Sequence, residues 1–195
     1  MLRNGALSNS TSLLFHCTDT FPIPENLLSY VNKVDFSTRN KPVLFGKGVC
    51  SPQNMCYGAG ALYGMNKLAL HEVNRYFSQN PKIHLETTHV VGKGRNLMVH
   101  EDYMVSYAYR QATGYPIISN HNIFNYHIAR EGTGSEDHPP ICYHKAKTVE
   151  GLYEYYELLY DPSTRKLRKL TDVDDLWQNH RDKFPYLASS AKGKW

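Results

Sequence analysis

The sequence predicts a mostly β (α+β) fold with a few short helices, because short segments rich in tyrosine and β-branched residues alternate with turn residues. Tyrosine, a residue type enriched in strands, occurs 15 times in 195 residues. The composition, with 41% hydrophobic and 21% charged residues, is typical of a globular protein. We expect a flexible leader over residues 1–12. Residues 13–195 are expected to form a single compact domain, or two β subdomains that share a core.

The expected strands follow one another at short intervals, which is typical of a barrel or sandwich. They are residues 41–49, 83–91, 96–101, 103–109, 115–119 and 123–128. Helical spacing of apolar residues predicts short helices over residues 25–33, 66–77 and 173–181, the second of them capped by Asn66. Residues 151–160 and 165–170, joined by a turn that begins at Asp161, are expected to form a hairpin with a basic edge. Residues 132–140 resemble a flexible connector.

The formal net charge of +4 permits an anionic partner without requiring one. Among the 10 histidines, none forms a metal-binding block such as H-E-x-x-H, so neither a metal nor another cofactor is expected.

The cysteines (Cys17, Cys50, Cys56 and Cys142) form no C-x-x-C pair. We expect free thiols in a reducing compartment. There is no apolar run that could span a membrane, and the start of the chain lacks the apolar core of a signal peptide. The sequence therefore predicts a cytoplasmic protein.

Tyr143 and Lys147 stand four positions apart after the break at Pro139-Pro140. This spacing places both side chains on one face of a helix or of a strand. A phenol and an amine that shift each other's titration, with a histidine as proton donor, can carry out acid–base chemistry without a metal. Tyr63 and Lys67 have the same spacing, so the pattern alone does not choose between the two pairs.

A cysteine protease is a weaker alternative, with Cys56 or Cys142 as the nucleophile and His16 as the base. The residues around Cys56 lack the G-x-[SC]-G arrangement that turns backbone N–H groups toward an oxyanion. A buried cysteine more often serves as a small apolar residue.

Three regions together resemble the poxin family, the cGAMP nucleases of poxviruses, baculoviruses and some lepidopteran insects. The first is Leu14-Phe15-His16 followed by Phe21-Pro22, and the second is Tyr57 with Gly60-Ala61-Leu62. The third is Tyr143-x-x-x-Lys147 ahead of a predicted strand, an Asp-initiated turn and a basic return strand. Their order and separation carry the resemblance.

The resemblance implies a β-barrel fold like that of chymotrypsin-type (3C-like) viral proteases, and a homodimer with an active site shared between subunits. It implies metal-independent cleavage of the 3′–5′ phosphodiester bond of 2′,3′-cGAMP, which antagonises cGAS–STING signalling. His16 corresponds to the proton donor to the leaving 5′-oxygen, and Tyr143 and Lys147 to the residues that position and activate the attacking 2′-hydroxyl. Lys166 and Arg168 would contact the phosphates. Neither a membrane nor a long nucleic acid is an expected partner.

A catalytically silent binding module is the alternative from another functional class. In this hypothesis the basic hairpin and the tyrosines hold a cyclic dinucleotide without cleaving it.

Overall fold

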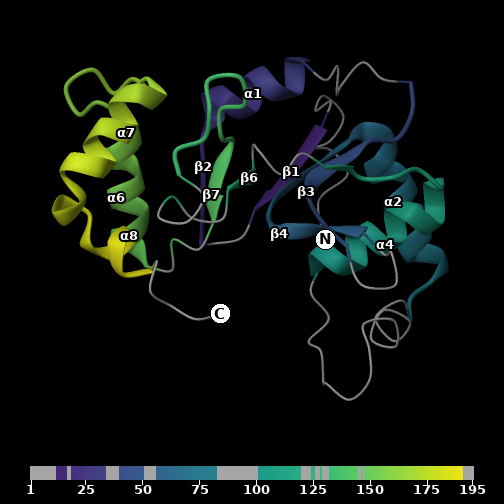
Figure 1. The fold of residues 1–195 in the computed structure, drawn as a ribbon. Helices are drawn as coiled ribbons and strands as arrows, with labels where there is room; N and C mark the ends of the chain where they lie inside the picture. The colour runs from purple at the N-terminus through teal and green to yellow at the C-terminus, as the bar shows by residue number, and fades with distance from the viewer. Residues whose placement is uncertain are drawn as a thin grey trace. The chain divides into compact units, whose positions relative to one another are not determined.

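The computed structural model describes residues 12–16, 19–33, 40–50, 56–82, 101–119, 124–125, 128, 132–144, 146 and 148–190 (Figure 1). The chain divides into two compact units. The first unit comprises Met1–Phe15 and Val31–Asn120, and the second comprises His16–Tyr30 and His121–Trp195.

The first unit contains a four-stranded sheet with the strand order β1-β4-β3-β5. Its strands are β1 (Ser12–His16), β3 (Leu44–Cys50), β4 (Cys56–Asn66) and β5 (Ile118–Ser119). β3 and β4 are antiparallel, and their register shifts between Gly46 and Lys47, as it does at a β-bulge. β5 runs parallel to β3.

Two helices, α2 (Lys67–Gln79) and α4 (Glu101–Thr113), pack against this sheet and against each other (Figure 1). The core of the unit combines side chains from β3, β4 and both helices: Leu44, Tyr63, Met65, Ala69, Val73, Ala108 and Tyr109. Ala69 and Val73 lie four residues apart on α2, so they share one face of the helix.

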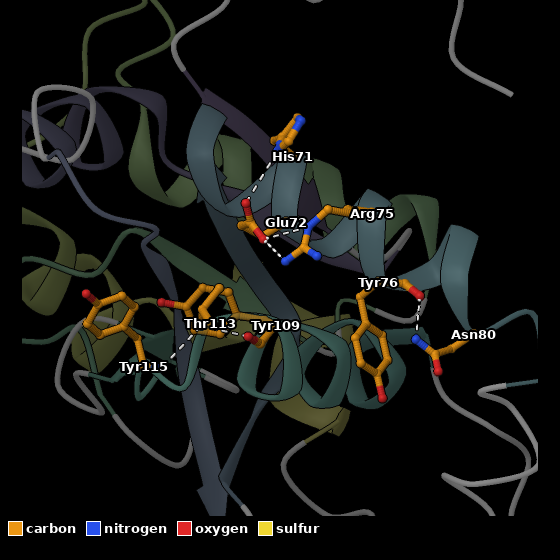
Figure 2. Close-up of polar contacts among 8 residues, drawn as sticks. All are labelled: His71, Glu72, Arg75, Tyr76, Asn80, Tyr109, Thr113 and Tyr115. Atoms are coloured by element: carbon orange, nitrogen blue, oxygen red, sulfur yellow. Dashed lines mark hydrogen bonds and ion pairs between the residues drawn. The ribbon is translucent and has the colours of Figure 1, made fainter.

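Local polar contacts lie within α2, at its C-terminal end and at the end of α4 (Figure 2). On α2, the Arg75 guanidinium donates to the Glu72 carboxylate, which lowers the pKa of that carboxyl. Asn80 Nδ2 donates to the Tyr76 carbonyl at 2.9 Å. At the end of α4, the Thr113 hydroxyl donates to the carbonyl of Tyr109 at 2.7 Å.

The second unit contains a three-stranded sheet with the order β2-β7-β6. β7 (Cys142–His144) is the central strand, antiparallel to β2 (Thr20–Pro22) and parallel to β6 (Phe124–Asn125). Helix α1 (Pro24–Lys33) begins two residues after β2 and continues past the boundary of the unit at Tyr30.

Helices α6 (Val149–Leu159), α7 (Leu170–Asn179) and α8 (Pro185–Ser190), with the 3₁₀ turn η1 (Arg181–Lys183), complete the second unit. Its core includes buried residues from β7, α6, α7 and α8, among them Tyr143, Tyr155, Leu158, Trp177 and Leu187. The buried carboxylate of Glu154 on α6 accepts the backbone N–H groups of Tyr186 and Leu187, at 3.1 and 2.8 Å. α6 therefore holds the first turn of α8 through this side chain.

The prediction of a mostly β barrel is wrong, and with it the chymotrypsin-like fold that the family resemblance implies. The described helices contain about twice as many residues as the described strands. The strands form two small sheets, and no closed barrel occurs in the part of the chain that the structure describes.

Two tyrosine-rich segments account for much of this error. Residues 103–109 were expected to form a strand but belong to α4, and residues 151–160, the expected first arm of a hairpin, form most of α6. In α6 the buried Gly151, Tyr155, Leu158 and Leu159 follow one another at spacings of four, three and one, which is the pattern of a helix face. The pairing of residues 151–160 with 165–170 is reduced to one bridge between Tyr160 and Leu167.

Other predicted elements are confirmed. The helices expected over residues 25–33, 66–77 and 173–181 correspond to α1, α2 and α7, and the strand expected over residues 41–49 corresponds to β3. The strand expected over residues 115–119 is shorter, as β5. Within the strand expected over residues 123–128, the described residues Phe124 and Asn125 form β6. The expected strand over residues 83–91 lies outside the described residues. So does the strand expected over residues 96–101, except for Glu101, which is the first residue of α4. None of the described helices has the length and apolar character needed to cross a bilayer.

Candidate functional site

Tyr143 lies in the core of the second unit. It is the middle residue of β7, where Phe21 of β2 is its antiparallel partner. Its side chain is fully buried, and its ring stacks on Tyr155 of α6 with centroids 5.0 Å apart. Its hydroxyl donates to the carbonyl of Thr133 at 3.0 Å. The structure therefore places the phenol inside the unit, in contact with a backbone acceptor.

The other two residues of the predicted catalytic set are not described with their side chains. His16 is the last residue of β1, and Lys147 lies outside the described residues. A catalytic role for His16, Tyr143 and Lys147 remains a prediction from sequence.

The connector at residues 132–140 is attached to the rest of the unit by several bonds. Besides the Tyr143 contact, the Thr133 hydroxyl donates to Asp174 Oδ1 on α7 at 2.7 Å. The side-chain amide of Asn26 on α1 donates to the Pro140 carbonyl at 2.8 Å. Gly134 has a φ of +97°, and a Cβ built there would lie 2.8 Å from the Pro140 ring. This connector therefore has a defined path.

A buried histidine at the end of β7 lies beside a carboxylate that precedes β2. His144 Nδ1 lies 2.8 Å from Thr20 Oγ1 and 3.3 Å from Asp19 Oδ1. The backbone carbonyl of Asp19 also accepts the N–H of Ala146 at 2.9 Å. The cluster joins the start of β2 to the end of β7.

Sequence reasoning did not find this cluster. The signal available was the alternation of strand residues, which places His144 and Tyr143 on opposite faces of β7. The pairing of Thr20 with His144 could not be read from the sequence, because the two residues are 124 positions apart.

The predicted phosphate-binding residues lie in residues 160–169, which we call the basic loop. It connects α6 to α7. Asp161 Oδ1 accepts the N–H groups of Ser163 and Thr164 at 3.0 and 2.8 Å. Hydrogen bonds from Ser163, followed by those from Thr164, hold the pKa of the Asp161 carboxyl well below its usual range. Arg165 has a φ of +56°, in the left-handed region. The Asp161 carboxylate therefore organises the turn.

Two backbone bonds close the basic loop. The Asp161 N–H donates to the Lys166 carbonyl at 2.9 Å, and the Arg168 N–H donates to the Leu159 carbonyl at 2.8 Å. They flank the Tyr160–Leu167 bridge, so Lys166 and Arg168 share the opposite side of the return segment from Leu167.

The two predicted phosphate contacts have different surroundings. Arg168 forms an ion pair with Asp161 Oδ2 at 3.2 Å, and its Nε is buried with no hydrogen-bond partner. Lys166 is exposed, and its ammonium has no ion-pair or hydrogen-bond acceptor among the described residues. The same is true of the Lys169 ammonium and of the Arg165 guanidinium. The carboxylate nearest to Lys169 in the sequence is that of Asp172, which lies three residues later in the first turn of α7. The basic loop thus presents three cations that its own carboxylate does not neutralise.

The cysteines give little support to a protease. The Cys142 thiol is fully buried in β7. Cys56 is the first residue of β4, and its side chain lies outside the described residues. In the described part of the chain, no three histidine, cysteine or acidic side chains are placed to hold a metal ion.

The fold and the site define an α+β protein of two units, with a cationic surface loop and a buried histidine–carboxylate cluster in the second unit. Comparison with protein-family models, with curated proteins and with solved structures finds no match to the chain. The resemblance to the poxin family therefore depends on the sequence motifs alone.

Proposed function

We propose that this protein binds phosphate-bearing nucleotides through the basic loop, and that 2′,3′-cGAMP is the ligand to test first. The observation that carries the proposal is the exposure of Arg165, Lys166 and Lys169 without a carboxylate partner among the described residues. Phosphate oxygens are strong acceptors for such side chains. The choice of ligand comes from the family resemblance.

Binding is favoured over catalysis because of the position of Tyr143. To activate a 2′-hydroxyl, its phenol must reach the ligand, whereas here it is buried and donates to Thr133. Cleavage of 2′,3′-cGAMP by a homodimer with a shared active site, acting in the cytoplasm against cGAS–STING signalling, is the alternative proposal. It is supported by the sequence motifs alone.

The binding test is calorimetric titration of the protein with 2′,3′-cGAMP at low and high salt. We expect saturable binding that weakens as salt increases, because exposed charges are screened. The Lys166→Ala and Lys169→Ala variants should each lose up to about fivefold in affinity, the value of an exposed ion pair. Lys183→Ala, which removes an exposed lysine of η1, is the matched control and should bind like the wild type.

Failure of the wild type to bind 2′,3′-cGAMP would contradict the proposed function. Normal binding by a Lys166→Ala/Lys169→Ala double variant would instead show that the ligand binds elsewhere.

Cleavage is measured in the same samples by chromatography after incubation in EDTA. If the wild type forms product and the His16→Ala variant does not, the nuclease hypothesis is supported. If the wild type binds the ligand without forming product, the hypothesis of a catalytically silent binding module is supported.

A further inference from the structure

Tyr156 is an exposed tyrosine held in a fixed position beside the basic loop. It lies on the last turn of α6, and 41% of its surface is exposed. Its ring stacks on Tyr160, with centroids 5.1 Å apart and planes inclined by 15°. Tyr160 is the first residue of the basic loop, so the stack begins where the loop begins.

The supporting ring of Tyr160 is itself fixed. Its hydroxyl donates to Glu25 Oε2 on α1 at 2.7 Å. Phe21 of β2 packs against it at a tilt, with centroids 6.5 Å apart. Tyr160 is buried, with 7% of its surface exposed. Tyr156 thus rests on a ring that is held by a hydrogen bond and by packing. A ligand that stacks on Tyr156 has less side-chain freedom to remove, which reduces the entropy cost of binding.

The cations of the basic loop lie close to this stack along the backbone. Tyr160 is bridged to Leu167, which stands between Lys166 and Arg168. Lys169 is two residues beyond Leu167 and has an extended backbone, with φ −65° and ψ 148°. Lys166 and Lys169 therefore lie one and two residues along the chain from Leu167, the residue that is bridged to Tyr160.

We propose that Tyr156 stacks on a nucleobase of the ligand, so that the basic loop selects nucleotides over anions that carry phosphate alone. The inference depends on the proposed function, because the cations supply the phosphate contact and Tyr156 adds the base. An aromatic side chain stacks on any base, so this predicts preference for nucleotides in general and not for one purine.

Tyr153 provides a matched control on the same helix. It is more exposed than Tyr156, at 66%, and it stacks on no other ring in the described part of the chain. Being three residues away on α6, it offers the same chemistry without the support of Tyr160.

The experiment compares two ligands, 2′,3′-cGAMP and inorganic triphosphate, by calorimetric titration of four proteins. Tyr156→Leu should lose about tenfold in affinity for 2′,3′-cGAMP, within the range measured for one base stacked on an aromatic ring, and keep its affinity for triphosphate. Tyr156→Phe, which keeps the ring, should bind both ligands like the wild type. Tyr153→Leu should also bind both like the wild type. Circular dichroism verifies that each variant is folded.

The outcomes separate the two proposals. If the wild type binds neither ligand, the proposed function fails. If the wild type binds both ligands and Tyr156→Leu keeps its affinity for 2′,3′-cGAMP, the proposed function stands and the stacking inference is overturned. If Tyr156→Leu lost affinity for both ligands equally, the stacking inference would also be overturned. The ring would then affect the conformation of the basic loop and would not contact the base.

Discussion

Tyr143 connects three parts of the second unit. Its ring packs on Tyr155 of α6, and its hydroxyl binds the carbonyl of Thr133, whose own hydroxyl binds Asp174 of α7. A phenol in this position has a structural task whether or not it also acts on a ligand. Its contribution to stability can therefore be measured independently of any activity.

We expect Tyr143→Phe to lower the free energy of unfolding by about 1–2 kcal/mol, because the variant keeps the ring but removes the donor to a buried carbonyl. Urea denaturation followed by tryptophan fluorescence provides the measurement, because the buried Trp177 lies in the same unit. Tyr153→Phe is the control and should leave stability unchanged, because this hydroxyl belongs to an exposed side chain. Equal stability of Tyr143→Phe and the wild type would contradict a structural role for the hydroxyl.

Some residues of the candidate site could be predicted from the sequence, and others could not. Lys166 and Arg168 were predicted because the basic run and the Asp161 turn are contiguous. That Asp161 pairs with Arg168 and leaves Lys166 unpaired depends on the conformation of the loop. The contact of His144 with Asp19 depends on the pairing of β2 with β7, two strands that are far apart in the chain. No local sequence pattern predicts this pairing. Nothing in the sequence distinguishes Tyr156 from the other tyrosines, which number 15 in all.

Asn66 fixes the junction between strand β4 and helix α2. Its side-chain oxygen accepts the N–H groups of Ala69 and Val43 at 2.9 and 3.0 Å. Its side-chain nitrogen donates to the Lys41 carbonyl at 2.9 Å. One buried side chain thus caps the helix and also holds the segment that leads into β3.

We expect Asn66→Ala to destabilise the first unit by roughly 2–4 kcal/mol, because it combines the loss of a helix cap with buried backbone groups that lose a partner. Far-UV circular dichroism during urea denaturation provides the measurement. Asn74→Ala is the matched control, since Asn74 is an exposed residue on the same helix. A loss for Asn66→Ala no larger than that for Asn74→Ala would show that the three hydrogen bonds contribute little.

The elements that the sequence predicted correctly have local signals. α2 follows its Asn66 cap, and α1 begins at a proline, Pro24. The segments that became α4 and α6 were assigned to strands because tyrosines are frequent in strands and recur there at short intervals. A tyrosine fits a helix equally well when neighbours three and four positions away share its buried face, as in α6. Which face is buried depends on tertiary packing, and this information is absent from a local pattern.

Across the whole molecule, each unit buries a tyrosine whose hydroxyl bonds to a distant part of the chain. Tyr109 of α4 donates to the Pro42 carbonyl at 3.1 Å, and Tyr160 donates to Glu25. Burial raises the pKa of the Tyr109 phenol. Burial, reinforced by the Glu25 carboxylate, raises the pKa of the Tyr160 phenol further. Both units are therefore expected to respond to alkaline pH.

The sign of the response follows from linkage. Below a pH of about 10, tyrosine is neutral in both the folded and the unfolded states and these phenols add no pH dependence. Above it, the unfolded chain ionises while the folded phenols stay neutral, so stability falls as pH rises, by at most about 1.4 kcal/mol per pH unit for each group. Urea denaturation at pH 8, 10 and 11 measures this decline. Tyr109→Phe and Tyr160→Phe should each be less stable than the wild type at pH 8, because each loses a hydrogen bond, yet decline less steeply above pH 10. Parallel declines in the wild type and both variants would assign the alkaline sensitivity to other groups.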